Sequence, residues 1–209
     1  VLGMGVRPNS ALARAAGIPL GEKGAIRVND RMETAVEGVW AAGDCAESFH
    51  LVSKRPFYIA LGTVANKQGR VAGINIVGGR ARFAGVVGTA ITKVCRLEVA
   101  RTGLQEKEIG LLGLDAVAAR IEGHTRAGYY PGTGRVTVKV WAEKGSGRLL
   151  GGQIVGGEGA AKRIDVLAAA LHAGFTVEEM INLDLSYAPP FSPVWDPVLI
   201  AVRRAAGMV

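Results

Sequence analysis

The pattern of apolar and polar positions divides the chain into two regions, the first of which ends near residue 80. Its apolar stretches are short and predict a helix at 12–16, strands at 25–28 and 39–42, and a polar loop at 47–55. Pro56 is well placed to begin a longer helix, which is expected to run from about 57 to 77. Gly78 and Gly79 end that helix.

Beyond residue 80 the pattern becomes one of strands. They are expected at 89–94, 97–101, 116–121, 136–140 and 149–155. The last two are joined through Lys144-Gly-Ser-Gly147, which is a hairpin signal. The sequence therefore predicts an antiparallel sheet in the second region.

Helices are expected beside that sheet. Thr102-Gly-Leu-Gln105 has the spacing of a capping box and should begin a short helix that ends at Gly113. The clearest amphipathic pattern covers 159–172, and a second capping box at Thr176-Val-Glu-Glu179 begins another helix. Prolines stiffen the backbone between residues 187 and 197, before a final apolar helix.

The composition of the 209 residues, 49% hydrophobic and 21% charged, is typical of a globular protein with a buried core. No apolar run is long enough for a membrane span and no signal-peptide pattern begins the chain, so we expect a cytoplasmic protein without membrane contact. The net charge of +7 is spread along the chain and does not favour nucleic acid. An anionic cofactor would account for part of it.

The cysteines and histidines give no metal signal. Cys45 and Cys95 lack the spacing of a metal site or a disulfide framework, so no metal is expected. Cys45 lies beside an acidic residue and is either a reactive thiol or, as its pattern favours, a small buried residue. His124 and His172 are isolated, as surface or core histidines usually are.

Gly43 and Asp44 follow the predicted strand at 39–42 and suggest a ligand. A glycine lets a ligand approach the backbone, and an ionised carboxylate accepts strong hydrogen bonds from hydroxyl groups. The pair therefore suits a sugar-like hydroxyl, although an isolated Gly-Asp pair is also typical of a turn without a ligand.

A series of motifs in order along the chain resembles the pyridine nucleotide-disulfide oxidoreductases. They are GMGVRPN (3–9), TAVEGVWAAGD (34–44), ANKQGRVAGINIVGG (65–79), TGLQE (102–106), GYYPG (128–132), GGEGAAKRIDVLA (156–168) and YAPPFSPVWDPV (187–198). Together they are similar to the branch that contains the coenzyme A-disulfide reductases, NADH oxidases and persulfide reductases.

The resemblance implies an α+β fold, in which the C-terminal segment of an FAD-binding α/β domain precedes an α+β dimerisation domain with an antiparallel sheet. Residues 1–28 would be the end of the NAD-binding domain and the return to the FAD domain. Residues 29–80 would be the C-terminal part of the FAD-binding domain, and 81–209 the dimerisation domain of a homodimer. Because the chain begins without methionine, inside an expected strand, we expect it to be a fragment.

The cofactors implied by the resemblance are FAD and NAD(P)H. Asp44, next to Gly43, would hold the flavin ribitol. The positive end of the helix expected at 57–77 would stabilise negative charge on the reduced flavin. Glycines 62, 69 and 73 are expected to be close-packing points on that helix. The residues placed nearest the ring are Leu61, Gly62, Thr63 and Val64.

In coenzyme A-disulfide reductases two tyrosines reach across the dimer to the thiol-disulfide centre. By resemblance one matches Tyr187, and the other matches Tyr129 or Tyr130, with spacing slightly in favour of Tyr129. A phenol hydroxyl can orient and stabilise a thiolate leaving group, whereas the alternative is that these aromatics anchor the interface. Lys162 and Arg163 either meet coenzyme A phosphates or lie on a solvated helix face.

The leading hypothesis is the C-terminal part of an FAD-dependent NAD(P)H oxidoreductase that reduces coenzyme A disulfide or a related disulfide or persulfide. The redox cysteine and phosphate-binding motif of the family belong to its N-terminal half, so the chain alone is expected to be inactive. An NADH oxidase on the same scaffold and a catalytically silent dimerisation fragment are the alternatives. The presence of Tyr187 and of GYYPG favours the reductase over the oxidase. The choice between NADH and NADPH stays open.

Overall fold

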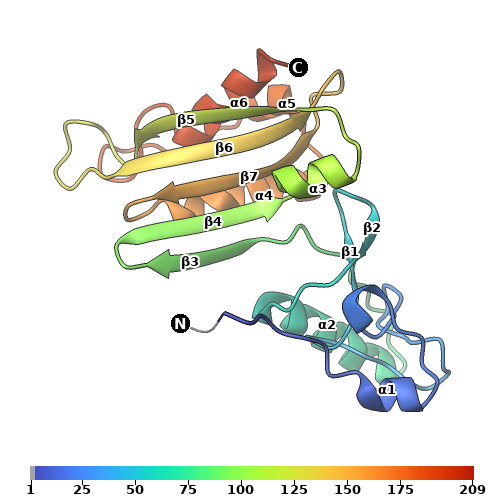
Figure 1. Ribbon diagram of the computed structural model, residues 1–209. Helices are drawn as coiled ribbons and strands as arrows, with labels where there is room; N and C mark the ends of the chain where they lie inside the picture. The colour runs from blue at the N-terminus through green and yellow to red at the C-terminus, as the bar shows by residue number, and fades with distance from the viewer. Residues whose placement is uncertain (1–2) are drawn as a thin grey trace. The chain divides into compact units, whose positions relative to one another are not determined.

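The computed structural model describes residues 3–209, and the chain forms two compact units, one up to Val86 and the other from Val87 to Val209 (Figure 1). Val1 and Leu2, which the resemblance assigns to the end of an NAD-binding domain, lie outside the described residues. The domain assignments made from the resemblance stay predictions.

The first unit is built from short elements and one long helix. They are α1 (Ala11–Ala15), the 3-10 helix η1 (Glu22–Gly24), β1 (Ser48–His50), β2 (Arg55–Phe57) and α2 (Gly62–Ile76). The helix predicted at 12–16 is confirmed within one residue by α1. The end predicted for α2 is also confirmed, because Gly78 leaves the helix with a φ of 86°.

The strands predicted at 25–28 and 39–42 do not form. Ile26 makes only isolated bridges, to Leu20 and Ala46, and Trp40 makes one, to Glu33. The four residues at 39–42 are only partly buried. Turns follow each segment within a few residues, so the single bridges are not extended into the ladder that a strand needs.

The loop predicted at 47–55 and the helix start predicted at Pro56 are also wrong. β1 and β2 form a short antiparallel hairpin in which Phe49 pairs with Pro56, and α2 begins only at Gly62. Proline fits this two-stranded ribbon because an edge strand has a side without hydrogen-bond partners. The turn of the hairpin is fixed by buried His50, whose Nδ1 accepts hydrogen bonds from the amides of Val52 and Ser53.

One face of helix α2 packs against the rest of the first unit, and the opposite face is exposed. Its buried residues are Val64, Gln68, Val71, Ala72 and Asn75. Val71 and Ala72 form a small core with Met32. The glycines at 62, 69 and 73 are not close-packing points within this unit, because a Cβ added at any of them would meet no atom within 4 Å.

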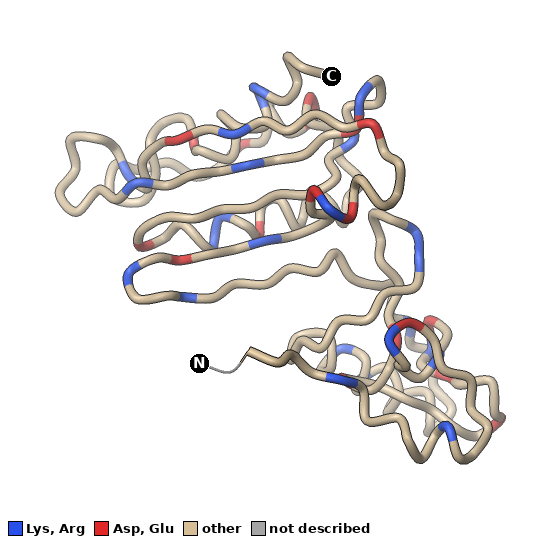
Figure 2. The backbone as a smooth tube through the Cα atoms, viewed as in Figure 1, with Lys and Arg blue, Asp and Glu red and all other residues tan. Residues whose placement is uncertain are grey.

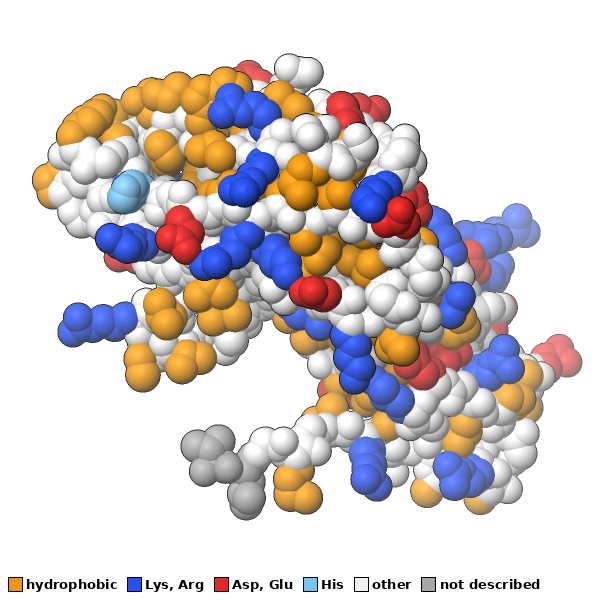
Figure 3. All heavy atoms as spheres, turned by 45° about the horizontal axis from the view of Figure 1, so that its top comes forward, with side chains coloured by type: hydrophobic (Ala, Val, Ile, Leu, Met, Phe, Trp, Pro, Cys, Tyr) orange, Lys and Arg blue, Asp and Glu red, His pale blue; other side chains and the backbone are white. Residues whose placement is uncertain are grey.

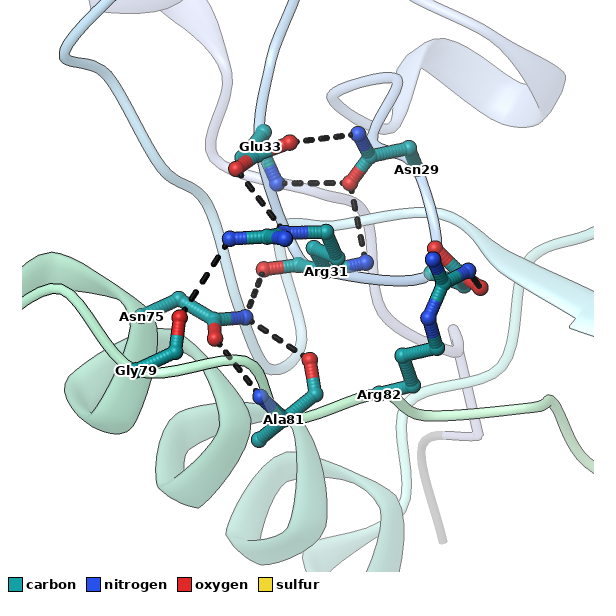
Figure 4. Close-up of polar contacts among 8 residues, drawn as sticks. Asn29, Arg31, Glu33, Asn75, Gly79, Ala81 and Arg82 are labelled. Atoms are coloured by element: carbon teal, nitrogen blue, oxygen red, sulfur yellow. Dashed lines mark hydrogen bonds and ion pairs between the residues drawn. The ribbon is translucent and has the colours of Figure 1, made fainter.

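A polar cluster joins the end of α2 to residues 29–33 (Figure 4). Asn75 donates through Nδ2 to the carbonyls of Arg31 (2.8 Å) and Ala81 (2.9 Å), and its Oδ1 accepts from the Ala81 amide at 2.8 Å. On the facing loop, Oδ1 of Asn29 accepts from the amides of Arg31 (2.9 Å) and Glu33 (3.0 Å). The cluster satisfies backbone groups where no regular strand does so.

The second unit is an antiparallel sheet with its C-terminal helices on one face (Figure 1). Its five strands lie in the order β3-β4-β7-β6-β5. They are β3 (Ala90–Val94), β4 (Leu97–Gly103), β5 (Ala116–His124), β6 (Arg135–Glu143) and β7 (Leu149–Gly156). The predicted strands and the hairpin at residues 144–147 are confirmed. So is the predicted α+β fold with an antiparallel sheet.

The helices of this unit are α3 (Glu106–Leu111), the 3-10 helix η2 (Ala161–Arg163), α4 (Ile164–Ala173), α5 (Val177–Ile181) and α6 (Pro197–Ala206). The core lies between the sheet and α4, α5 and α6. Alternate residues of β6, such as Val138 and Val140, are fully buried, as are Leu167 of α4 and Val202 of α6. This packing fixes the ends of the sheet from which the loops emerge.

The capping box predicted at Thr176 is confirmed, since Thr176 and Glu179 exchange both hydrogen bonds. The box predicted at Thr102–Gln105 is wrong: the pair that forms is Gln105 with Glu108. Thr102 remains in β4 because its hydroxyl is buried and bonds that of Thr89. The helix predicted from residue 159 begins as α4 only at Ile164, after the 3-10 turn.

Within residues 3–209 no helix combines the length and the apolar character that crossing a membrane requires. The cytoplasmic location expected from the sequence stays a prediction.

Candidate functional site

The turn at Gly43 and Asp44 lies against the first turns of α2. Gly43 has a φ of 81°, and a Cβ added to it would come within 3.5 Å of the Cβ of Ala65. The side chain of Asp44 is exposed. The turn and the N-terminus of α2 therefore adjoin, as the resemblance implies for a flavin site.

The side chain of Gln68, on α2, is hydrogen-bonded to this turn. Its side-chain oxygen accepts a hydrogen bond from the Gly43 amide at 2.8 Å. Its side-chain nitrogen donates to the Glu47 carbonyl at 3.2 Å and to the Ser48 hydroxyl at 2.9 Å. Gln68 is completely buried. Sequence reasoning missed this residue, although a glutamine in phase with Val64 and Val71 on the buried face was a signal.

Tyr58 holds the other side of the turn. Its hydroxyl donates to the Asp44 carbonyl at 3.0 Å. Burial is the main cause that raises the pKa of the Tyr58 phenol above its ordinary value, and the nearby charge of Asp44 adds to the effect. The phenol therefore stays protonated, and remains a donor, at neutral pH.

The N-terminus of α2 has no side-chain cap. Leu61 is the N-cap residue in an extended conformation, and Gly62 and Thr63 are exposed, whereas Val64 is buried. The Val64 and Ala65 amides donate to the Leu61 carbonyl, both at 2.9 Å. The amides that precede them at the start of a helix have no acceptor within it, so this end favours negative charge. The four residues predicted nearest the flavin thus form the start of a 15-residue helix beside an exposed carboxylate. That arrangement fits a flavin.

The second unit brings two of the three predicted tyrosines together. Tyr129 lies in the loop between β5 and β6, and Tyr187 lies between α5 and α6; these two segments emerge at the same end of the sheet (Figure 1). A hydrogen bond with the Tyr129 phenol is the main cause that raises the pKa of Tyr187 above its ordinary value. Tyr129 is 78% exposed and Tyr187 47%. Tyr130 is partly buried and is not a partner of Tyr187.

Backbone contacts join the loops that carry these tyrosines. The Ala127 amide donates to the Pro189 carbonyl at 3.2 Å, and the Thr133 hydroxyl lies within 2.9 Å of the Ala127 carbonyl and 2.6 Å of the Tyr130 carbonyl. The phenols therefore project from loops that are tied together rather than from independent segments.

Both readings offered for Arg163 are wrong. Its side chain is only 11% exposed and pairs with Asp196, so it neither lies on a solvated face nor reaches out to a phosphate. Lys162 is exposed and pairs with Asp165 on the same turn. The sequence pattern placed both residues on the amphipathic helix, but both belong to the 3-10 turn before it, where Lys162 is exposed and Arg163 is mostly buried.

The cysteines do not form a site. Cys45 is half-buried and Cys95 is exposed, and both are free thiols. Among the described residues no group of three or more His, Cys, Asp or Glu is arranged to hold a metal ion.

Charged side chains are distributed over both units. Lys and Arg are interspersed with Asp and Glu along the backbone (Figure 2), and the face shown in Figure 3 carries basic, acidic and hydrophobic side chains together. The expectation that the protein does not bind nucleic acid stays a prediction.

Comparison with models of known protein families identifies the family of this chain. The family model described as the pyridine nucleotide-disulphide oxidoreductase dimerisation domain matches residues 89–197, more than half of the chain. The chain belongs to the pyridine nucleotide-disulphide oxidoreductase family. A second model, described as pyridine nucleotide-disulphide oxidoreductase, matches residues 1–69. The resemblance found in the motifs is thereby confirmed.

Relatives within the pyridine nucleotide-disulphide oxidoreductases include reductases and an oxidase. An NAD(P)H coenzyme A polysulfide/persulfide reductase of Pyrococcus horikoshii is 45% identical over 97% of this chain and 45% of its own length. An NADH oxidase of Methanocaldococcus jannaschii is 38% identical over 98% of this chain and 45% of its own length. The chain spans less than half of either relative.

Comparison with a solved structure supports the same family assignment. An NAD-dependent persulfide reductase from A. fulgidus matches with a TM-score of 0.95 and 46% identity, over 98% of this chain and 38% of that one. The architecture of this chain is therefore that of a segment of a pyridine nucleotide-disulphide oxidoreductase.

Proposed function

We propose that this chain forms part of an FAD-dependent NAD(P)H oxidoreductase that reduces coenzyme A disulfide or a related disulfide or persulfide. The observation that carries the choice of substrate is that Tyr129 and Tyr187 lie on two segments whose backbones are joined by the hydrogen bond from the Ala127 amide to the Pro189 carbonyl. The name of the Pyrococcus horikoshii relative, a coenzyme A polysulfide/persulfide reductase, supports the same choice.

The flavin would be held by the first unit. The exposed Asp44 carboxylate would accept hydrogen bonds from the ribitol hydroxyls, and Gly43 leaves the backbone open for that approach. The residues Leu61 to Val64 would lie nearest the ring, where the helix N-terminus favours negative charge. FAD, when bound, would carry electrons from NAD(P)H toward the disulfide.

The tyrosine pair would act on the sulfur that leaves. A thiolate released from a disulfide or persulfide carries negative charge, and a phenol hydroxyl stabilises that charge by donating a hydrogen bond. The raised pKa of Tyr187 keeps its hydroxyl protonated at neutral pH. Because residues 89–197 match the dimerisation domain, the tyrosines of one subunit would serve the redox centre of the other in a homodimer.

An NADH oxidase is the second candidate, because the Methanocaldococcus jannaschii relative carries that name. The two functions differ in the acceptor of electrons. The reductase consumes NADH or NADPH in proportion to the added coenzyme A disulfide or persulfide, whereas the oxidase consumes it in proportion to oxygen. Turnover under nitrogen, with and without the disulfide, therefore separates them.

The flavin assignment is tested by Asp44→Ala, with Glu37→Ala as the control because Glu37 is also exposed in the same unit. We expect Asp44→Ala to raise the dissociation constant of FAD about 10- to 150-fold, as expected for losing hydrogen bonds of about 1.5–3 kcal/mol to a charged acceptor. Glu37→Ala should leave it unchanged. A protein that contains no flavin, or equal affinity in both variants, would contradict the proposal.

A further inference from the structure

A single guanidinium lies between the two loops that carry the tyrosine pair. Arg163 donates through Nε to Oδ2 of Asp196 at 2.8 Å and through Nη1 to the Gly159 carbonyl at 2.7 Å. The side chains of Arg163 and Asp196 are only 11% and 12% exposed. These two contacts fix the plane of the guanidinium.

The remaining nitrogen bridges the loops. Nη2 of Arg163 donates to the Thr125 carbonyl at 2.6 Å and to the Phe191 carbonyl at 2.9 Å. Thr125 precedes Tyr129 in the loop between β5 and β6, and Phe191 follows Tyr187 in the segment before α6. One nitrogen atom therefore ties together the two backbones from which the phenols project, beside the hydrogen bond from the Ala127 amide to the Pro189 carbonyl.

The acid that anchors Arg163 is itself held in place. Asp196 is the N-cap of α6, where its Oδ1 accepts from the Val198 amide at 2.9 Å. Its Oδ2 also accepts from the Ser192 hydroxyl at 3.2 Å. Through Asp196, the guanidinium of Arg163 is thus anchored to the N-terminus of α6, a helix of the core.

We propose that Arg163 is a positioning residue, which holds Tyr129 and Tyr187 close enough for both hydroxyls to meet one sulfur atom of the substrate. The inference deepens the proposed function and rests on it only for the identity of the substrate. Lysine cannot replace Arg163, because an ammonium lacks the planar fork that here reaches a carboxylate and the carbonyls of two loops at once.

The test follows each tyrosine ring by NMR of protein labelled with ¹³C at the phenol carbon, in Arg163→Lys and in Lys162→Met as the matched control. The resonance of Tyr187 is assigned with Tyr187→Phe. In the unaltered protein we expect Tyr187 to titrate above its ordinary value, because Tyr129 is its partner. Arg163→Lys should move that titration back toward the ordinary value, and Lys162→Met should not.

Unchanged titration of Tyr187 in folded Arg163→Lys would overturn the inference. Should that variant not fold, Asp196→Asn serves in its place. It keeps an acceptor oxygen for the cap of α6 but removes the charge that pairs with Arg163, and it should shift the titration in the same direction.

A kinetic measurement separates this inference from the proposed function. In the complete flavin-loaded protein of which this chain would be a part, Arg163→Lys should slow reoxidation by coenzyme A disulfide about 10- to 100-fold, as small misplacements of reacting groups do, with flavin reduction by NADH unchanged. An altered titration together with a Tyr187→Phe variant that reduces the disulfide at the normal rate would leave the positioning role intact and remove the proposed role of the tyrosines.

Discussion

The backbone amide of Gly43 donates a 2.8 Å hydrogen bond to the side chain of Gln68, which is completely buried in α2. The same side chain donates to the Glu47 carbonyl and to the Ser48 hydroxyl. Breaking any of these three hydrogen bonds would leave a buried polar group without a partner, which raises the free energy of the folded state. Gln68 therefore holds the turn that presents Asp44 in one geometry relative to the N-terminus of α2.

Gln68→Met is expected to weaken both the fold and the cofactor site. It keeps the volume of the side chain but leaves the Gly43 amide without its partner, which should lower the free energy of unfolding by about 1–3 kcal/mol. Because the turn loses its support, affinity for FAD should fall as well. Urea unfolding and flavin absorbance measure the two effects, and Lys67→Met, on the exposed side of the same helix, is the control. Unaltered FAD affinity in a destabilised Gln68→Met protein would limit Gln68 to a structural role.

The bare face of α2 gives a second prediction. Glycine in a helix is less favourable than alanine by about 0.5–1 kcal/mol, and a Cβ at Gly69 would meet no atom within 4 Å. Gly69→Ala should therefore raise the melting temperature of the chain without cofactor. Gly79→Ala is the contrasting variant, because its Cβ would overlap Ile74 and should lower that temperature.

Flavin binding decides whether Gly69 has a further role. If something lies flat against this face in the complete protein, as the three glycines led us to expect, Gly69→Ala should bind FAD less well although the free chain is more stable. Normal FAD binding by a stabilised Gly69→Ala protein would show that nothing lies against the helix at this position.

The sheet of the second unit could be predicted from the sequence because its signals are local. The strands repeat apolar residues at every second position, and Thr176 and Glu179 exchange hydrogen bonds across three residues. Pro56 misled the prediction because proline is equally suited to the first turn of a helix and to an edge strand. Only the pairing with Phe49, which is not a local signal, decides between them.

The exposed residues of the site could be predicted from the sequence, but the buried residues that position them could not. Asp44 and the tyrosines stand in motifs that a resemblance reveals. Gln68 and Arg163 act on backbone groups far away in the sequence, at separations of 25 and 28 to 38 residues. Almost every residue offers a backbone amide and carbonyl, so a side chain that bonds these groups can do so whatever residue carries them. The sequence of the partner segment therefore does not reveal the contact.

Tyr187→Phe is expected to affect one half of the catalytic cycle. It removes a hydroxyl that would stabilise the leaving thiolate, so the reaction of reduced flavoprotein with coenzyme A disulfide should slow about 100- to 1,000-fold. Reduction of the flavin by NADH should be nearly unchanged. Stopped-flow absorbance measures both rates. Tyr130→Phe is the control, because Tyr130 is not the partner of Tyr187. Equal rates for Tyr187→Phe and the unaltered protein in both half-reactions would remove Tyr187 from the mechanism.

The hairpin between β6 and β7 should make the stability of the protein depend on pH. The Glu143 carboxylate accepts hydrogen bonds from Arg148 at Nε and Nη2, both at 3.2 Å, and from the Ser146 hydroxyl at 2.6 Å. The bond from Arg148 is the main cause that lowers the pKa of Glu143 below its ordinary value, the bond from Ser146 adds to it, and burial opposes both. A lowered pKa in the folded state means that the ionised form stabilises the fold above the unfolded pKa, about 4.3. That contribution is lost as the pH falls through the lower, folded value.

Glu143→Gln is therefore expected to lower the free energy of unfolding at pH 7 by about 0.5–1 kcal/mol, a modest value because the pair is partly exposed and screened by solvent. As the pH falls below about 4.3, the unaltered protein should lose this advantage and the two unfolding curves should converge. Urea unfolding at several pH values measures the difference without adding salt. Glu158→Gln, whose ion pair with Arg126 is long and exposed, should show no difference at any pH. A gap between Glu143→Gln and the unaltered protein that stays constant from pH 7 to pH 3 would mean that the loss comes from packing in the hairpin and not from the charge of Glu143.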